Sequence, residues 1–353
     1  MLAKSAPSQK IKKDKTAHYI VGARYDWAFF ILAPLWALGL GLLLGWTPLG
    51  TPRYPLFGRS ESTLSIFSGI FTASHLFIVF FRSHGNATIF KTYPKRFVWV
   101  PLILFSAMML SSWVLIAAFV ISVWWDVYHS GLQTFGLGRI YDSKYNADCQ
   151  TGRMLDYGLN LVLYAAPIFA GVSFADHVVH FQEFYGVGSP KLGALAELLM
   201  AQRPVWAWLA AGITVPYLFY YLWAYRNLSK RGYVISRQKI ALLVSTALCS
   251  VWAWGFNPFG QAFFIMNFFH SLQYFALVAH TEQSSLEKRL GLSGFEWKKL
   301  AICLLIVITA AAYGVWAEFC GESNHTAFSL LITVSLLHFW YDGFIWSVRK
   351  RQI

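Results

Sequence analysis

The sequence predicts an all-α integral membrane protein, a bundle of about ten transmembrane helices with both termini in the cytoplasm. Of its 353 residues, 57% are hydrophobic and only 13% are charged, and the mean hydropathy is +0.47. These values are typical of a chain embedded in lipid. The hydrophobic residues gather in segments close to the length that crosses a bilayer, and the basic residues are divided unequally among the connections between them.

The hydrophobic segments define the predicted helices in chain order. Most of them approach the roughly 20 residues that a hydrocarbon core about 30 Å thick requires. The third and fourth segments are together too long for one span, and Ser111-Ser112 is the only plausible turn between them. The predicted spans are 26–46, 64–82, 97–111, 113–138, 154–173, 205–224, 239–256, 261–280, 299–318 and 326–347.

The basic residues give the orientation. With the N-terminus in the cytoplasm, 25 of the 29 lysines and arginines fall on the cytoplasmic side. Only Arg53, Arg59, Lys191 and Arg203 fall on the other side. This asymmetry is the positive-inside pattern. The charge of +13 therefore indicates topology and attraction to anionic lipid, not nucleic-acid binding. We expect a bacterial inner (cytoplasmic) membrane protein.

The predicted domain organisation is simple. A basic cytoplasmic tail, 1–24, precedes a single transmembrane domain, 25–348, and a second basic tail, 349–353, follows it. The one long extracytoplasmic connection, 174–204, contains a short amphipathic run that we expect to lie on the membrane surface. No cleavable signal peptide is expected. The four cysteines form no Cys-x-x-Cys pair, so neither a disulfide framework nor a thiolate zinc site is expected.

Four histidines lie inside predicted spans at similar depths. His75, His129, His270 and His338 are each about 7–11 residues from the basic end of their span, or about 10–16 Å at 1.5 Å per residue. Ionisable groups in a membrane are costly and by default indicate a functional site. Imidazole is also the commonest metal ligand among side chains. We therefore predict that the four rings meet around a metal ion.

Carboxylates accompany two of these histidines. Asp126 precedes His129 by three residues, and Asp342 follows His338 by four, so each pair shares a helix face. Asp126 and Asp342 are the predicted catalytic residues, as metal ligands, as partners that orient the ligands, or as a base.

Further polar residues extend the predicted site. Gln133 and Gln273 are expected to hydrogen-bond between helices rather than to bind metal. His84 and His280, nearer the cytoplasmic ends of their spans, are additional candidate ligands. Four imidazoles would serve one metal, and six with the two carboxylates could serve two.

Two other polar groups are less specific. Asp176, His177, His180 and Glu183 in the outer connection could bind a metal, although the polar face of a surface helix is the commoner explanation. Whether this group binds anything stays open. The segment Arg139-Ile-Tyr141 is interpreted as an anchor at the membrane interface.

The donor set points to a class of chemistry. Nitrogen ligands with some oxygen and no sulfur suit iron, copper or zinc better than magnesium or calcium. The location favours a lipid-like or isoprenoid substrate that enters from the bilayer. Iron, as one or two ions, would activate O₂ toward C–H or C=C bonds and would need an electron-transfer partner at the cytoplasmic face. Zinc would instead activate water for hydrolysis.

This organisation resembles that of multi-histidine membrane oxygenases, namely fatty-acid desaturases and hydroxylases, alkane hydroxylases and the Brp/Blh-type carotenoid-cleaving proteins. The resemblance implies non-haem iron held near one membrane face and oxidation of a lipid-like substrate. The chain departs from these families because it has no His-x-x-His-His box and no His-x-x-x-His on one helix. No catalytic residue is transferred from them.

Two strings carry a second resemblance, to uncharacterised bacterial multi-pass membrane proteins. They are His129-x-x-x-Gln133-x-Phe-Gly136-x-x-Arg139-Ile-Tyr141 and His338-Phe-x-x-Asp342-Gly-Phe-Ile-Trp346. This resemblance implies no activity.

Other functions would use the same residues. A proton-coupled transporter could use the His and Asp groups as a relay, and prolines interrupt four predicted spans, as broken helices require. A haem-binding electron carrier could use paired histidines as axial ligands. A structural assembly factor would need none of them.

Overall fold

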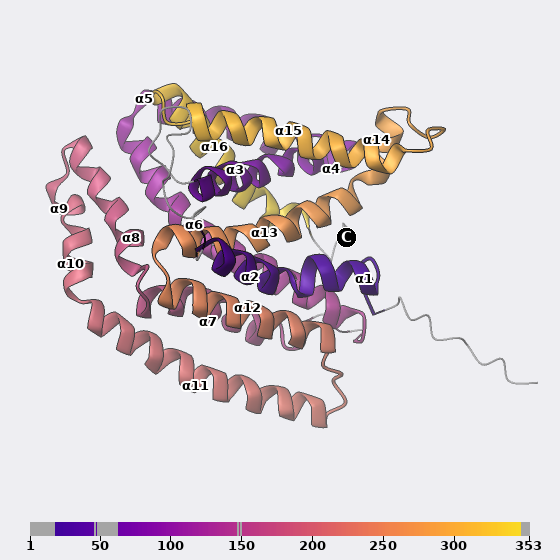
Figure 1. Cartoon of the computed structure of the whole chain (residues 1–353), viewed down its shortest axis with the longest axis horizontal. Coiled ribbons are helices and arrows are strands. Elements are labelled where there is room, and N and C mark those ends of the chain that lie inside the picture. Colours follow the sequence, from indigo (N-terminus) through magenta and orange to yellow (C-terminus); the bar gives the residue numbers. More distant parts are fainter. Residues whose placement is uncertain (1–17, 46, 48–62, 147, 149, 347–353) are drawn as a thin grey trace, which may run out of the picture.

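The structure is a computed structural model that describes residues 18–45, 47, 63–146, 148 and 150–346. All regular structure in these residues is helical, and they contain no strand, so the predicted all-α class is confirmed. Most of the long helices run alongside one another in one bundle (Figure 1). Residues 1–17 and 347–353, which include most of the predicted tails, lie outside the described residues.

The described helices begin and end close to the predicted segments. They are α1 (Ala23–Asp26), the π-helix η1 (Trp27–Ile31), α2 (Ala33–Gly45), α3 (Thr63–Ser83), α4 (Ala87–Thr92), α5 (Pro94–Leu110), α6 (Ser112–Ser143), α7 (Arg153–Ala170), α8 (Phe174–Val179), the 3₁₀-helix η3 (His180–Val187), α9 (Pro190–Gly193), α10 (Leu195–Ala201), α11 (Arg203–Lys230), α12 (Arg237–Phe256), α13 (Phe259–Thr281), α14 (Gln283–Arg289), α15 (Lys298–Cys320) and α16 (His325–Ile345).

Seven of the described helices are long and apolar enough to cross a membrane: α3, α6, α11, α12, α13, α15 and α16. The count rises to nine if two bent pairs are each one span, the first bent by 50° between η1 and α2 and the second by 91° between α7 and α8. The predicted span 97–111 corresponds to α5, which has 17 residues and is not among them. Membrane-spanning helices are therefore supported, whereas about ten spans is not confirmed.

Local sequence signals explain several helix boundaries. The predicted turn at Ser111-Ser112 is confirmed, because Ser111 is extended and its Oγ accepts a hydrogen bond from the amide of Val114 at 3.4 Å. Asn324 caps α16 in the same way, accepting from the amide of Ala327 at 2.9 Å. Pro94 lies in the first turn of α5, where a missing N–H costs nothing. The Ser111 cap separates α5 from α6, which hydropathy alone would merge.

Four helices pack in a cyclic order that positions the candidate site. α3 contacts α13 and α16, and α6 contacts the same two helices. α15 packs on the outside of α3, at a point where a Cβ on Gly314 would lie only 2.3 Å from the carbonyl oxygen of Ile70. Such small residues let helix backbones approach closely in a membrane. The four central helices therefore enclose a shared interior, which α15 covers on one side.

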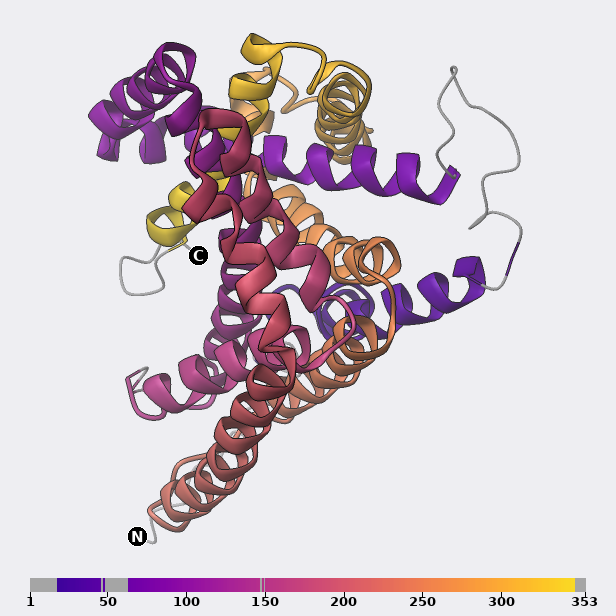
Figure 2. The ribbon, with the colours of Figure 1, turned by 90° about the vertical axis from the view of Figure 1, so that its left-hand side faces the viewer.

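α11 lies along the edge of the molecule (Figures 1 and 2). It packs mainly on α7, and only 6% of its most apolar window is buried. Large side chains such as Trp208, Phe219 and Trp223 are exposed on it. This apolar, exposed surface is what a lipid-facing helix requires.

A buried ion network joins α6, α7, α11 and α12. The Lys239 ammonium lies 2.6 Å from a carboxylate oxygen of Asp142 and 3.1 Å from both oxygens of Asp156. Arg139 donates to the same two carboxylates at 3.1 and 2.7 Å. Tyr225 donates to Asp156 at 2.7 Å. Two cations and two carboxylates thus balance, and hydrogen bonds satisfy the buried charges.

The interpretation of Arg139 and Tyr141 as interface anchors is wrong. Arg139 is 8% exposed and Tyr141 is fully buried, where its hydroxyl donates to Asp26 at 3.0 Å. The physical reason is that buried carboxylates lie beside the last turns of α6: Asp142 and Asp156 accept hydrogen bonds from Arg139, and Asp26 accepts one from Tyr141. These partners hold both side chains inside the bundle.

We predict that Lys239→Ala lowers the free energy of unfolding by about 3–5 kcal/mol, because removal of one partner leaves buried charge unpaired. The matched control is Lys298→Ala, which removes a cation that pairs with Glu287 at 2.6 Å, with the two side chains 31% and 21% exposed. That change should cost about 1 kcal/mol or less. Thermal unfolding of both variants in detergent checks this, and equal losses of stability would contradict a structural role for the network.

Candidate metal centre

The four intramembrane histidines form a closed ring. His75 comes from α3, His270 from α13, His129 from α6 and His338 from α16, which is the cyclic order of helix packing. Neighbouring imidazole centroids around this ring are 5.0, 5.0, 4.8 and 4.9 Å apart, and each pair is nearly perpendicular. All four side chains are buried, with at most 4% exposed. We call this arrangement the imidazole ring cluster.

The nitrogen atoms of the cluster approach one another closely enough to share a cation. One ring nitrogen from each of His75, His270 and His338 lies within 4.8 Å of the other two. The Nε2 atoms of His129 and His338 are 3.1 Å apart. Ligands of a tetrahedral ion with bonds of about 2.0–2.1 Å are separated by about 3.4 Å, a separation that the His129–His338 pair approaches. His129 and His338 also form a second group with Asp342 that could hold a metal, so His338 belongs to both groups.

Several of these nitrogens are otherwise unsatisfied. Within the described residues, neither ring nitrogen of His270 has a hydrogen-bond partner. The ring nitrogens of His75 and Nδ1 of His338 make no hydrogen bond of ordinary geometry there, although the backbone of Thr72 interacts with the His75 ring and that of Leu76 with the His338 ring. Buried polar atoms are almost always paired, so each exception needs an explanation. A bound cation would supply the missing partner.

Asp342 completes the cluster on one side. Its Oδ2 lies 3.6 Å from Nε2 of His129 and 3.9 Å from Nε2 of His338. Its Oδ1 accepts hydrogen bonds from the Tyr274 hydroxyl at 2.6 Å and from Trp346 Nε1 at 2.9 Å. The two bonds fix the carboxylate and leave the other oxygen directed at the imidazoles, which is how partners outside the ligand shell orient a ligand.

A buried cation, Arg82, supports this arrangement from the end of α3 that lies next to Trp346. The Arg82 guanidinium lies 3.9 Å from the centre of the Trp346 ring, pairs with the buried Glu282, and donates to the Ile345 carbonyl oxygen. Sequence reasoning did not assign Tyr274, Trp346 or Glu282 to the site. Spacing could have found the first two, since Tyr274 follows His270 by four residues and Trp346 follows Asp342 by four.

The two glutamines link helices, as predicted. Gln133 of α6 donates through Nε2 to the His270 carbonyl oxygen at 3.0 Å and to Gln273 Oε1 at 2.9 Å. Gln273 of α13 donates onward to the Phe30 carbonyl oxygen at 2.7 Å. These bonds fix α6, α13 and η1 relative to one another next to the imidazole ring cluster.

Three predicted site residues are not brought into the cluster. Asp126 interacts with the side chain of Asn267 and does not belong to either of the His/Asp groups that could hold a metal among the described residues. His84 follows His75 by nine residues, and on an ideal helix that spacing places the two side chains on opposite faces. Its nitrogens lie 2.9 Å from Ser83 Oγ and 3.3 Å from the Phe97 carbonyl oxygen. His280 is exposed, near Tyr25.

The outer polar group does not converge either. His177 is 1% exposed, its Nδ1 lies 2.9 Å from the Ser173 carbonyl oxygen, and its ring packs 4.9 Å from both Trp254 and Phe259. It is a core residue rather than part of a surface face. Within the described residues, no metal-holding group includes this segment.

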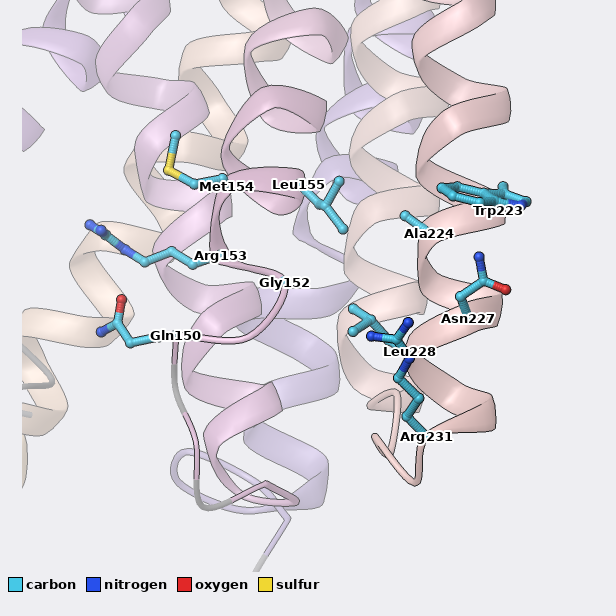
Figure 3. Close-up of a pocket in the computed structure, with 10 residues that line it drawn as sticks. All are labelled: Gln150, Gly152, Arg153, Met154, Leu155, Trp223, Ala224, Asn227, Leu228 and Arg231. Carbon is cyan, nitrogen blue, oxygen red and sulfur yellow. The ribbon is translucent and has the colours of Figure 1, made fainter.

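A separate hollow of about 340 Å³ lies between the start of α7 and the last turns of α11. Figure 3 shows its lining, in which Arg153 points away from α11 and Trp223 and Asn227 project from α11. No histidine lines it, so it is not part of the imidazole ring cluster.

Comparison with known proteins gave no match: no family model, no curated protein and no solved structure matches this chain. The site must therefore be interpreted from its own geometry.

We predict that Gln133→Leu and Gln273→Leu each reduce stability by about 1 kcal/mol, the typical strength of an interhelical hydrogen bond in a membrane. Because the two side chains share one bond, the double variant should lose less than the sum of the single variants. Unfolding in mixed micelles measures this. Gln202→Leu, at an exposed position, is the control, because its effect should simply add to that of either glutamine variant. Strictly additive losses in the Gln133/Gln273 double variant would contradict a hydrogen bond between the two side chains.

Proposed function

We propose that this protein is a metal-dependent membrane oxidoreductase, an oxygenase that uses non-haem iron and acts on a lipid-like or isoprenoid substrate. The observation that carries the proposal is the imidazole ring cluster with Asp342 beside it. Four buried imidazoles come from four helices, and among the described residues His75, His270 and His338 have ring nitrogens without a hydrogen-bond partner of ordinary geometry. Such a set is costly in a membrane unless a cation satisfies it.

The donor set supports a single transition-metal ion. His75, His129, His270 and His338 would be its ligands, and Asp342 would be a fifth ligand or would orient two of the imidazoles. Nitrogen-rich ligands with one carboxylate suit iron, zinc or copper. His84 and His280 belong to neither group of described residues that could hold a metal, and their absence favours one ion rather than two. Bound iron would supply the ability to activate O₂.

The surrounding residues have definable roles in this proposal. Tyr274 and Trp346 hold the Asp342 carboxylate, whose negative charge offsets part of the cation's charge. The aromatic and aliphatic side chains around the cluster exclude water, which prevents side reactions in an oxidising site. Arg82 and Glu282 lie toward the end of α3 that carries basic residues, where an electron-transfer partner would approach. We place that face in the cytoplasm of a bacterial inner membrane, from the asymmetry of basic residues.

Two alternatives can be compared with the geometry. A porphyrin does not fit between the four imidazoles, because the macrocycle is wider than the entire ring of side chains at centroid spacings of 4.8–5.0 Å. A proton relay would also use the 3.1 Å contact between His129 and His338. The metal content of the purified protein separates the relay from the oxidoreductase, because a relay needs no ion. Zinc in place of iron would favour hydrolysis.

We predict that the detergent-purified protein retains about one transition-metal ion per chain, and that His75→Ala, His270→Ala or His338→Ala loses it. The variants His84→Ala and His280→Ala are matched controls, since they remove imidazoles from outside the cluster and should keep the metal. Elemental analysis with an optical spectrum measures this. Wild-type protein that contains no stoichiometric transition metal would contradict the oxidoreductase proposal.

We predict that Tyr274→Phe weakens metal binding about 10–100-fold, because it removes a hydrogen bond that orients the Asp342 carboxylate. Asp342→Asn should weaken binding at least as much. Asp126→Asn, at a carboxylate outside the cluster, should leave affinity unchanged. Competition with a chelator gives the affinities, and an equal loss in the Asp126 and Asp342 variants would show that the carboxylates act only through folding.

A further inference from the structure

A hollow of about 420 Å³ lies on the side of α6 near the imidazole ring cluster. Five of its lining residues belong to α6, and one comes from η3 in the outer connection. We call it the α6 groove, lined by Val120, Ile121, Trp124, Trp125, Tyr128 and Phe181. Its size is within the range of small-molecule sites. Ile121 and Tyr128 are exposed, so the groove opens to the surroundings of a membrane-spanning helix.

The groove is separated from the metal ligands by two aromatic side chains. Trp125 precedes His129 by four residues, so it lies one turn away on the same face of α6. The Trp125 ring is 6.2 Å from the Phe339 ring, and Phe339 is 5.0 Å from His129 and 5.7 Å from His338. The rings of Trp125 and Phe339 therefore connect the groove to His129 through a continuous series of side-chain contacts.

The chemistry of the lining selects the occupant. None of the six side chains is charged, and four of them are aromatic. A sugar or an ionised ligand would lose its hydration there without gaining partners. A hydrocarbon chain would instead gain contacts with the rings at little desolvation cost. Because the opening faces the surroundings of a spanning helix, lipid is the phase from which such a chain enters.

We propose that the α6 groove holds the hydrocarbon part of the substrate, an acyl or isoprenoid chain, with its reacting end beside Trp125, at the side of the groove that Phe339 connects to His129. That this end of the substrate is oxidised rests on the proposed function, whereas binding of a hydrocarbon chain in the groove does not. The proposal assigns a substrate-binding role to Ile121, Trp125 and Tyr128, which contact no metal.

The test uses the full chain in phosphatidylcholine nanodiscs with a photoreactive long-chain fatty alcohol, followed by mass spectrometry of the labelled peptides. We expect labelling of the segment 120–128 and of Phe181 above that of the exposed face of α11, with competition by excess unlabelled alcohol. Ile121→Trp fills the groove and should reduce its labelling about tenfold, which corresponds to lost contact with about two methylene groups.

The matched control is Ile213→Trp on α11, where Ile213 is 61% exposed, compared with 53% for Ile121. This change should leave groove labelling unaltered. If Ile121→Trp fails to fold, Ile121→Phe provides a smaller obstruction. Equal labelling of α11 and the groove, or unchanged labelling in the folded Ile121 variant, overturns the proposal.

Metal content measured on the same samples keeps the two proposals distinguishable. Retained metal with diffuse labelling would refute the groove and leave the proposed function standing. Groove labelling without bound metal would support the groove as a hydrocarbon site and refute the oxidoreductase. Ile121→Trp should retain its metal, because Ile121 lies outside the imidazole ring cluster.

Discussion

The high cost of burying a polar atom without a partner is the constraint on which the rest of this structure depends. Water cannot satisfy groups inside a lipid-embedded bundle, so each must find a partner on another helix. Most do so here: Gln133 reaches α13, Ser250 of α12 donates to the Leu163 carbonyl oxygen of α7 at 2.7 Å, and Lys239 sits among carboxylates. Other buried polar atoms of the described residues also lack a partner, but His75 and His270 leave both ring nitrogens unpaired by ordinary hydrogen-bond geometry, and the two rings are neighbours in one cluster.

The polar interior forms two layers that differ in character. The ion network around Lys239 is balanced in charge and bonded throughout, so it fixes α6, α7, α11 and α12 without needing a ligand. The imidazole layer consists of four imidazoles, which are neutral when they bind a cation, and the Asp342 carboxylate. Unlike the ion network, it contains no lysine or arginine that would balance the carboxylate. α6 contributes to both layers, with His129 near its middle and Arg139 near its end. The ion network thus holds α6 in place, and α6 carries both His129 and most of the lining of the α6 groove.

The sequence predicted the fold class and the central part of the site for a clear physical reason. Hydropathy and the 3.6-residue period determine where helices form and which side chains share a face, so the similar depth of His75, His129, His270 and His338 could be predicted from the sequence. The partners of Asp342 come from other turns and other helices, and depth says nothing about rotation of one helix against another. For that reason Asp126 and Asp342 looked equivalent in the sequence, although only Asp342 faces the imidazoles. The buried role of Arg139 was missed because a basic residue near a span end is usually an anchor.

The order of the ligands along the chain has a consequence for biogenesis. His129 and His338 are in contact across 209 residues of sequence. At roughly 5–20 residues per second, synthesis of that interval takes about 10–40 s, during which the earlier helices are already made. The imidazole ring cluster therefore cannot be complete until α16 has been synthesised and has packed against α3 and α6. Until then His75, His129 and His270 lack their neighbour from α16, so the last described helix is the one that closes the ring.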